Sequence, residues 1–297
     1  MNTYAYERIT ERIVSLLEQG TVPWHKPWKV STGSPRNLVS KKRYRGINAF
    51  LLLASRYESP YWLTFRQVTM LGGTVRKGEK SCPVVFWKPM KLVDTKSGEE
   101  KDIPLLRLYH VFNVAQCDNL KASPESEETD ALPMLPDEMI ANMPNRPLIK
   151  HGMAHAFYSP HDDIVGMPAK ERFRCPDLYY STLFHELVHA TGHQSRLNRP
   201  AIAERNGFGS ESYSKEELVA EMGAAFLCGQ AEIVERTLDG SAAYIEGWLK
   251  QLNDGKSLIV HAAAQAQRAT DFILGTYADE SSVTGTAKTP EPAEIAA

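Results

Sequence analysis

The sequence lacks any apolar stretch long enough to cross a lipid bilayer. Its longest apolar run, from Ala49 to Ala54, is far shorter than the roughly 20 residues that a membrane-spanning helix needs. The N-terminus also lacks the basic region and apolar core of a secretory signal peptide. These absences predict a cytoplasmic protein with no membrane partner.

Cysteine is scarce, and its spacing has no recognisable pattern. The four cysteines, Cys82, Cys117, Cys175 and Cys228, include no C-x-x-C pair. This spacing argues against a disulfide framework and against a zinc site built from cysteines. We expect all four to be reduced residues of the core.

The composition is that of a folded protein and not of a disordered one. Hydrophobic residues make up 42% of the chain and charged residues 24%, which is typical of globular proteins. The length of 297 residues suffices for two domains. Residues 121–135 are rich in proline, serine and acidic residues, so we predict a linker there between domains at 1–120 and 136–278. Residues 279–297 have the composition of a disordered tail.

Hydrophobic periodicity predicts a mixed α+β fold, with a small N-terminal α+β domain. Expected helices cover residues 3–19, a segment starting near 48, 62–73, 178–193, 214–233, 241–252 and 257–274, and expected strands cover 82–90, 105–114, 155–160 and 163–168. A polar hairpin joins the first two strands. Ser214, with Glu217 three residues later, is the expected cap of its helix.

The net charge of −2 hides a separation of charge along the chain. Residues 1–121 contain 20 lysines and arginines against 10 acidic residues, whereas the remainder contains 14 against 26. Such an asymmetry indicates that the N-terminal part meets a polyanion. A solvated charged surface would give the same composition.

Basic and aromatic residues concentrate in residues 22–91. This window holds 14 lysines and arginines, two glutamates and four of the five tryptophans. Positive charge tracks a phosphate backbone, and exposed rings stack on unpaired bases with about 1–3 kcal/mol each, so single-stranded nucleic acid is the predicted partner and duplex should bind more weakly. The candidate binding residues are Trp24, Lys26, Trp28, Lys41, Lys42, Arg43, Tyr44, Arg45, Lys77 and Lys80.

The segment STLFHELVHATGH carries the spacing of a metal site. His185 and His189 are one helical turn apart, so one face of a helix can present both to a single cation. Glu186 lies about 100° around the helix, where it can take a proton from a water that the metal activates. We predict one divalent metal ion, with zinc the expected element, and Glu186 as the catalytic residue of a metallopeptidase.

The third protein ligand is less well defined by spacing. In the H-E-x-x-H-x-x-G-x-x-H class it stands six residues after the second histidine, where this chain has Ser195, so His193 is not the preferred candidate. The segment from Glu217 to Glu221 resembles the E-x-x-[SA]-[DEN] pattern of glutamate-liganded zincins. That resemblance implies Glu217 as ligand, with Glu221 orienting a ligating histidine; Glu221 as the ligand remains an alternative.

A series of motifs resembles the ArdC antirestriction proteins of conjugative plasmids. The motifs are EQGTVPWHKPW, YRGINAFLLL, YWLTFRQVTMLGGTVRKGEKS, YHVFNVAQ, HELVHATGHQSRLNR and EELVAEMGAAFL. The N-terminal half also resembles a region of plasmid conjugative primases. The resemblance covers nearly the whole chain apart from the linker and tail. It implies a single-stranded-DNA-binding domain joined to a zincin-like metallopeptidase domain, in a protein that protects incoming plasmid DNA from restriction.

Two functions are compatible with these patterns. In the first, the chain binds single-stranded DNA and its metal site hydrolyses a protein linked to the host restriction system. In the second, the chain is only a single-stranded-DNA-binding module, and its metal site is structural or vestigial. The sequence alone leaves the enzymatic activity undecided between them.

Overall fold

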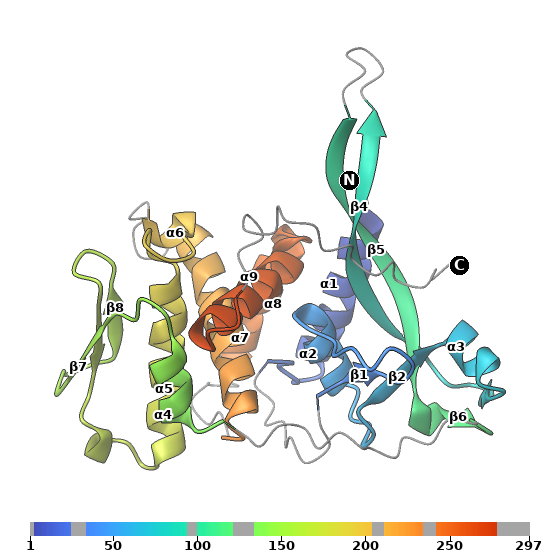
Figure 1. Cartoon of the computed structure of the whole chain (residues 1–297), viewed down its shortest axis with the longest axis horizontal. Helices are drawn as coiled ribbons and strands as arrows, with labels where there is room; N and C mark the ends of the chain where they lie inside the picture. Colours follow the sequence, from blue (N-terminus) through green and yellow to red (C-terminus); the bar gives the residue numbers. More distant parts are fainter. Residues whose placement is uncertain are drawn as a thin grey trace.

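The computed structural model describes residues 3–24, 34–93, 100–120, 134–203, 211–233 and 242–277. Helices and three small sheets make up a mixed α+β fold, as the sequence predicts (Figure 1). Helices α7 and α9 lie in the middle of the view, between the N-terminal sheet on one side and α5 with the β7–β9 sheet on the other. No helix among the described residues is long and apolar enough to span a membrane.

The described part of the N-terminal half contains a four-stranded sheet, a two-stranded sheet and three helices. In chain order they are α1 (Thr3–Glu18), β1 (Arg36–Asn37), α2 (Ile47–Leu53), β2 (Tyr61–Thr64), α3 (Phe65–Met70), β3 (Thr74–Val75), β4 (Cys82–Val93), β5 (Glu100–Asn113), a 3-10 turn (Val114–Gln116) and β6 (Cys117–Asp118). The larger sheet has the order β1-β2-β5-β4, and β3 pairs with β6. Strands β4 and β5 form a long antiparallel ribbon that rises away from the helices in Figure 1, so the two predicted strands are confirmed as a pair. The polar hairpin predicted between them lies largely outside the described residues.

Helix α1 is amphipathic because its apolar residues recur at four-residue spacing. Ile9, Ile13 and Leu17 are at most 1% exposed and face the core. The turn that follows the helix contains Gly20, whose φ of 70° lies in the left-handed region that glycine adopts readily. Its buried side packs against α8, α9 and the β4–β5 ribbon.

The helix predicted over residues 62–73 is only partly correct. Its first residues form strand β2, because Trp62 and Leu63 point to opposite faces of the sheet, Trp62 into the main core and Leu63 into a small second cluster. Thr64 then begins α3: its hydroxyl accepts a hydrogen bond from the Gln67 N–H at 3.2 Å, and the Gln67 side chain accepts one from the Thr64 N–H at 2.9 Å.

The C-terminal half contains six helices and a three-stranded sheet in its described part. In chain order they are α4 (Pro136–Asn142), β7 (Leu148–His151), β8 (Phe157–Ser159), β9 (Ile164–Met167), a 3-10 turn (Lys170–Arg172), α5 (Pro176–Thr191), α6 (Pro200–Ala203), α7 (Glu211–Gln230), α8 (Ala242–Asp254) and α9 (Leu258–Ile273). The predicted pair β8 and β9 is confirmed as antiparallel, and β7, which the sequence analysis missed, adds parallel to β9. Helix α7 begins before Ser214, so the cap predicted there is wrong; no proline or glycine stops the helix between Glu211 and Ser214.

One hydrophobic core is shared by the two halves. Phe50 of α2 stacks on Phe226 of α7 with ring centroids 4.4 Å apart, and the same cluster runs from α1 to α9. The predicted domains at 1–120 and 136–278 therefore share a core in space, and their independence stays a prediction. The predicted linker lies outside the described residues except for its last two, and the predicted tail lies wholly outside them.

Trp24 belongs to this shared core, which contradicts its predicted role as an exposed stacking ring. Its side chain is 0% exposed, and its indole N–H donates a hydrogen bond to Glu221 Oε2 at 3.1 Å. The ring also meets Trp248 of α8 edge-on, at 6.2 Å between centroids. The proline-rich segment around Trp24 gives no sign of this burial, because the residues that cover the ring come from α7 and α8.

Replacing Trp24 with alanine should lower the free energy of unfolding by about 3–5 kcal/mol, because the change leaves a cavity beside a buried carboxylate. Chemical denaturation followed by circular dichroism measures this. Met70→Ala is the control, since Met70 is 73% exposed and its loss should change stability by no more than about 0.5 kcal/mol. A Trp24→Ala protein with unchanged stability and lost nucleic-acid affinity would contradict the structural role.

Candidate metal centre

Helix α5 presents its two histidines on one face. Pro176 occupies the first turn, where its missing N–H costs nothing, and Leu183, Phe184 and Leu187 bury the opposite side of the helix. Four residues separate His185 from His189, so their rings lie one above the other, at 4.7 Å between centroids. The predicted helix and its metal-binding face are thus set locally by the sequence.

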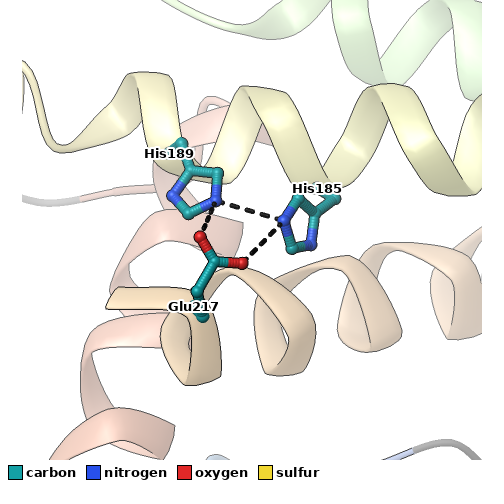
Figure 2. Close-up of side chains that lie close together, drawn as sticks. All are labelled: His185, His189 and Glu217. Carbon is teal, nitrogen blue, oxygen red and sulfur yellow. Dashed lines mark hydrogen bonds and ion pairs between the residues drawn. The ribbon is translucent and has the colours of Figure 1, made fainter. Parts of the chain in front are cut away.

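Glu217 of α7 completes the cluster (Figure 2). The Nε2 atoms of His185 and His189 lie 3.1 Å apart. The two carboxylate oxygens of Glu217 reach one ring each, 3.5 Å from His185 Nε2 and 3.4 Å from His189 Nε2. Among the described residues this is the one group of three or more potential ligands that converges. The preferred ligand set from the sequence therefore meets in space.

The spacing of these atoms fits a single metal ion. Ligands that surround a tetrahedral zinc at about 2.0–2.1 Å are about 3.3–3.4 Å from one another. The observed separations of 3.1–3.5 Å are close to that value. Two ring nitrogens and a carboxylate that point at one another are also the donor set that a divalent cation satisfies.

The local charges favour a cation at the same place. Burial opposes the charged form of His189, yet the nearby carboxylates of Glu216 and Glu217 raise its pKa to about 10. Burial likewise opposes ionised Glu217, but His185 and His189 hold its pKa below the usual range. The raised pKa of His189 shows that the two carboxylates create a negative potential at the rings, and this potential attracts positive charge there.

Glu186 lies beside the cluster without joining it. Burial raises the pKa of its carboxyl group, although His189 and His185 act in the opposite direction. The backbone of Tyr158 in β8 lies close enough to this carboxyl group to act toward a lower pKa as well. Glu186 thus faces the space between the histidine pair and the edge strand β8.

Glu216, which the sequence analysis missed, takes the orienting position that was predicted for Glu221. Its Oε1 is 3.4 Å from His189 Nδ1, an ion-pair distance and not a well-aligned hydrogen bond. Glu221 instead accepts the indole hydrogen bond of Trp24, so it turns away from the histidines. The adjacent residues Glu216 and Glu217 point about 100° apart on the helix. Glu217 therefore reaches both rings, whereas Glu216 reaches only His189.

Arg199 holds Glu216 in place. Its guanidinium donates to both carboxylate oxygens, at 3.0 and 2.5 Å, and also to Thr191 Oγ1 and the Val188 carbonyl of α5. Arg199 and Glu216 are at most 5% exposed. A buried bidentate pair of this kind fixes the orientation of both side chains.

Close contact between α5 and α7 depends on a glycine. A Cβ atom at Gly223 would lie 2.7 Å from a methyl group of Val188, which is too close for any real side chain. The missing side chain lets the two helices approach, and this approach brings Glu217 to the histidines. From Leu218 to Cys228, α7 is apolar apart from Glu221, and most of these residues are buried.

Other polar residues near the site have structural roles. His193 lies beyond the end of α5, where its Nδ1 is 2.8 Å from Ser195 Oγ, and it does not join the cluster. Arg196 pairs with Asp163 and donates to the Ala190 carbonyl at 2.7 Å, which ties the β8–β9 hairpin to the end of α5. This tie places β8 next to Glu186.

The predicted nucleic-acid-binding residues fall into three groups. Lys41, Lys42, Arg43, Lys77 and Lys80 are exposed, and Arg45 is exposed but pairs with Asp271 of α9. Tyr44 is 7% exposed and packs in the core, so its predicted availability for stacking is wrong. The reason is that Tyr44 leads directly into the buried helix α2. Lys26 and Trp28 lie outside the described residues.

A zincin-like metallopeptidase domain is the class that this pair of helices defines, and the family model with that description matches residues 137–265. A second model, the N-terminal domain of anti-restriction factor ArdC, matches residues 3–112. Crystal structures of the antirestriction ArdC protein from plasmid R388, metal-free and Mn(II)-bound, have TM-scores of 0.73 and identities of 38% and 37%, over 91% of this chain and 97% of theirs. The chain belongs to the ArdC antirestriction family.

Further relatives extend the comparison. The uncharacterized protein y4eC of Sinorhizobium fredii is 34% identical over 93% of this chain and 94% of its own length. Two Escherichia coli proteins named DNA primase TraC are 35% and 34% identical over 97% and 91% of this chain. This chain spans only 29% and 20% of those two primases. Together with the Mn(II)-bound relative, the convergent ligands indicate a divalent metal site here.

Exchange of each candidate third ligand for glutamine should separate their roles. Glu217→Gln should lose bound metal, since the neutral amide replaces the carboxylate at the histidines, whereas Glu221→Gln should keep it and can still accept the Trp24 hydrogen bond. Elemental analysis after dialysis against a weak chelator measures both, with circular dichroism as the folding control. Metal loss in Glu221→Gln alone would reverse the assignment, and loss in neither would reject both.

Proposed function

We propose that this protein is a cytoplasmic antirestriction factor that binds single-stranded DNA and acts as a zinc-dependent peptidase, protecting incoming conjugative plasmid DNA from restriction. The convergence of His185, His189 and Glu217, with Glu186 beside them, carries the enzymatic part of the proposal. Membership of the ArdC family supports the antirestriction part. The substrate would be a protein linked to the host restriction system.

Four side chains have assigned roles in the proposed hydrolysis. His185, His189 and Glu217 would hold one zinc ion, which would supply a Lewis acid that polarises a carbonyl and lowers the pKa of water. Glu186 accepts a proton from the attacking water and delivers it to the leaving amine. Its place on α5 directly after His185, where both histidines act on the pKa of its carboxyl group, supports this role.

Strand β8 offers a place for an extended peptide. It is an edge strand of the order β7-β9-β8, so one side of its backbone has no partner strand within the described sheet. A substrate strand added there would run past Glu186, because β8 packs beside α5 and the Tyr158 backbone lies near that carboxyl group. Arg196 and Asp163 keep this edge fixed against α5.

Exposed basic residues in the N-terminal half support the nucleic-acid part. Lys41, Lys42 and Arg43 lie on the turn after β1, and Lys77 and Lys80 lie on the loop before β4. Lysine and arginine side chains that point into solvent can neutralise phosphates without further desolvation. The preference for single strands rests on exposed aromatic rings in the same half.

The variant Glu186→Gln tests the peptidase. It should reduce peptide hydrolysis by at least about 100-fold, because glutamine has the size of glutamate but cannot accept the proton. The measurement is cleavage of β-casein, an unfolded substrate, by zinc-loaded protein with and without oligo(dT). Elemental analysis should find unchanged metal in the variant.

Glu171→Gln is the matched control for that experiment, because Glu171 is exposed on the 3-10 turn of the same half and should leave cleavage unchanged. Cleavage by Glu186→Gln at the rate of the unaltered protein would contradict the assigned role. Plasmid transfer into a restricting host is the second readout: full protection by Glu186→Gln would favour the pure DNA-binding module.

DNA binding makes a separate prediction. The full chain should bind a single-stranded oligonucleotide more tightly than the duplex of the same sequence, because a duplex keeps its bases stacked away from protein rings. Fluorescence anisotropy over a salt series should show the logarithm of the binding constant falling linearly with the logarithm of the salt concentration, with a slope of about −0.7 for each phosphate contact. Equal affinity for both forms would refute the stacking argument, and salt-independent binding would refute the phosphate contacts.

A further inference from the structure

A cleft of about 920 Å³ lies in the N-terminal half, far along the chain from the metal ligands. One wall is α1, a second is the turn that follows α2, and a third is the start of β4 with the facing end of β5. Its floor includes the buried residues Trp62 and Cys82. The volume is at the upper end of the range for ligand sites, about 300–1,000 Å³.

The cleft has an excess of positive charge that its own acids do not neutralise. Glu11 already pairs with Arg8 at 2.8 Å, and Glu79 pairs with Arg76 at 2.9 Å. The remaining basic residues of the lining are Arg12, Arg56 and Lys80. Within the part of the chain that the structure describes, none of these three forms an ion pair. Three cations around one concave surface favour a ligand with several phosphates.

Arg56 occupies a backbone position that favours glycine. Its φ is 60°, in the left-handed region, and its N–H closes the end of α2 by donating to the Leu53 carbonyl at 3.2 Å. Glycine or asparagine usually fills such a position at the end of a helix. An arginine held there against its backbone preference is the kind of local strain that marks a functional side chain.

Tyr57 supplies a partly exposed ring next to these charges. It is 37% exposed, and it meets the buried Trp62 edge-on at 5.6 Å between centroids. The contact with Trp62 supports the ring from below, while its free part faces the cleft that both residues line. A ring supported in this way can stack on an unpaired base, and so can the nearby His110, which is exposed and contacts Ser81 Oγ at 3.1 Å.

We propose that this cleft is the single-stranded-DNA-binding groove of the protein. Arg12, Arg56 and Lys80 contact successive phosphates, and Tyr57 stacks on a base. This inference rests on the proposed DNA-binding function and names its interface. The basic turn at 41–43 is a weaker candidate, because Tyr44 beside it is buried and Lys41 already lies over the Tyr61 ring at 5.3 Å.

The variant Arg56→Gly tests the groove with little risk to the fold. It removes the guanidinium and installs the residue that the left-handed backbone prefers, so its melting temperature should equal or exceed that of the unaltered protein. Its affinity for labelled oligo(dT), measured by anisotropy with the full chain, should fall, and the log–log salt slope should decrease by about 0.7. Lys80→Ala and Arg12→Ala should each lower the affinity and the salt slope in the same way.

Tyr57→Leu tests stacking separately from charge. Leucine can still cover Trp62, but it offers no ring to a base, so affinity should fall at least about fivefold while the salt slope stays unchanged. Lys150→Ala is the control, because Lys150 is an exposed residue of β7 outside the cleft. This variant should bind oligo(dT) as the unaltered protein does.

Lys41→Gly separates the groove from the competing basic turn. Lys41 also has a left-handed backbone, with φ of 59°, but it lies outside the cleft. The proposal expects a smaller loss of affinity from Lys41→Gly than from Arg56→Gly. A larger loss of affinity from Lys41→Gly, with the affinity of Arg56→Gly and Lys80→Ala unchanged, would overturn the proposed groove but not the proposed DNA-binding function. Absence of oligo(dT) binding by the unaltered protein would refute both.

Discussion

Three glutamates on one buried helix impose the constraint on which the rest of the structure depends. Glu216 and Glu221 of α7 are at most 6% exposed, and Glu217 is half-buried between them. A carboxylate removed from water is costly unless a partner compensates for the lost hydration. Each of the three has a different one: Arg199 for Glu216, the histidine pair for Glu217, and the Trp24 indole for Glu221. Rotation of α7 about its axis would break all three contacts at once, so the ligand position of Glu217 is fixed by its neighbours.

The same helix joins the two halves of the molecule. Glu221 lies one helical turn beyond Glu217, and its partner Trp24 is 197 residues away in sequence. Further along α7, Phe226 stacks on Phe50 of the N-terminal half. Trp24 and Phe50 of the N-terminal half therefore both contact α7, the helix that carries the metal ligand Glu217. The shared core is not a passive interface between domains, because it sets the register of α7.

Local features of the site could be predicted from the sequence, whereas its tertiary partners could not. The spacing of His185 and His189 acts within one helix, and strands β8 and β9 are short runs of aromatic or aliphatic residues bounded by aspartates and prolines, so both were predictable. Glu217 was preferred only through resemblance to known zincins. The role of Glu216 depends on how α7 is rotated against α5, which is set by Gly223 touching Val188. The burial of Trp24 likewise depends on helices that lie far away in the chain, so a basic, proline-rich neighbourhood suggested exposure incorrectly.

The two candidate sites use different supports. The metal cluster lies between α5 and α7, whereas the cleft is built by α1, the turn after α2 and the start of β4. A peptide added to β8 and a strand in the cleft would therefore contact separate surfaces, and neither would exclude the other. Any influence of one ligand on the other has to pass through the packed core, where α7 holds contacts from both halves. Changes at Trp24 or Phe50 would disturb that core, because both residues contact α7. Changes at Arg56 or Tyr57, which line the cleft, leave α7 untouched. This difference allows DNA binding to be separated from the chemistry of the metal site.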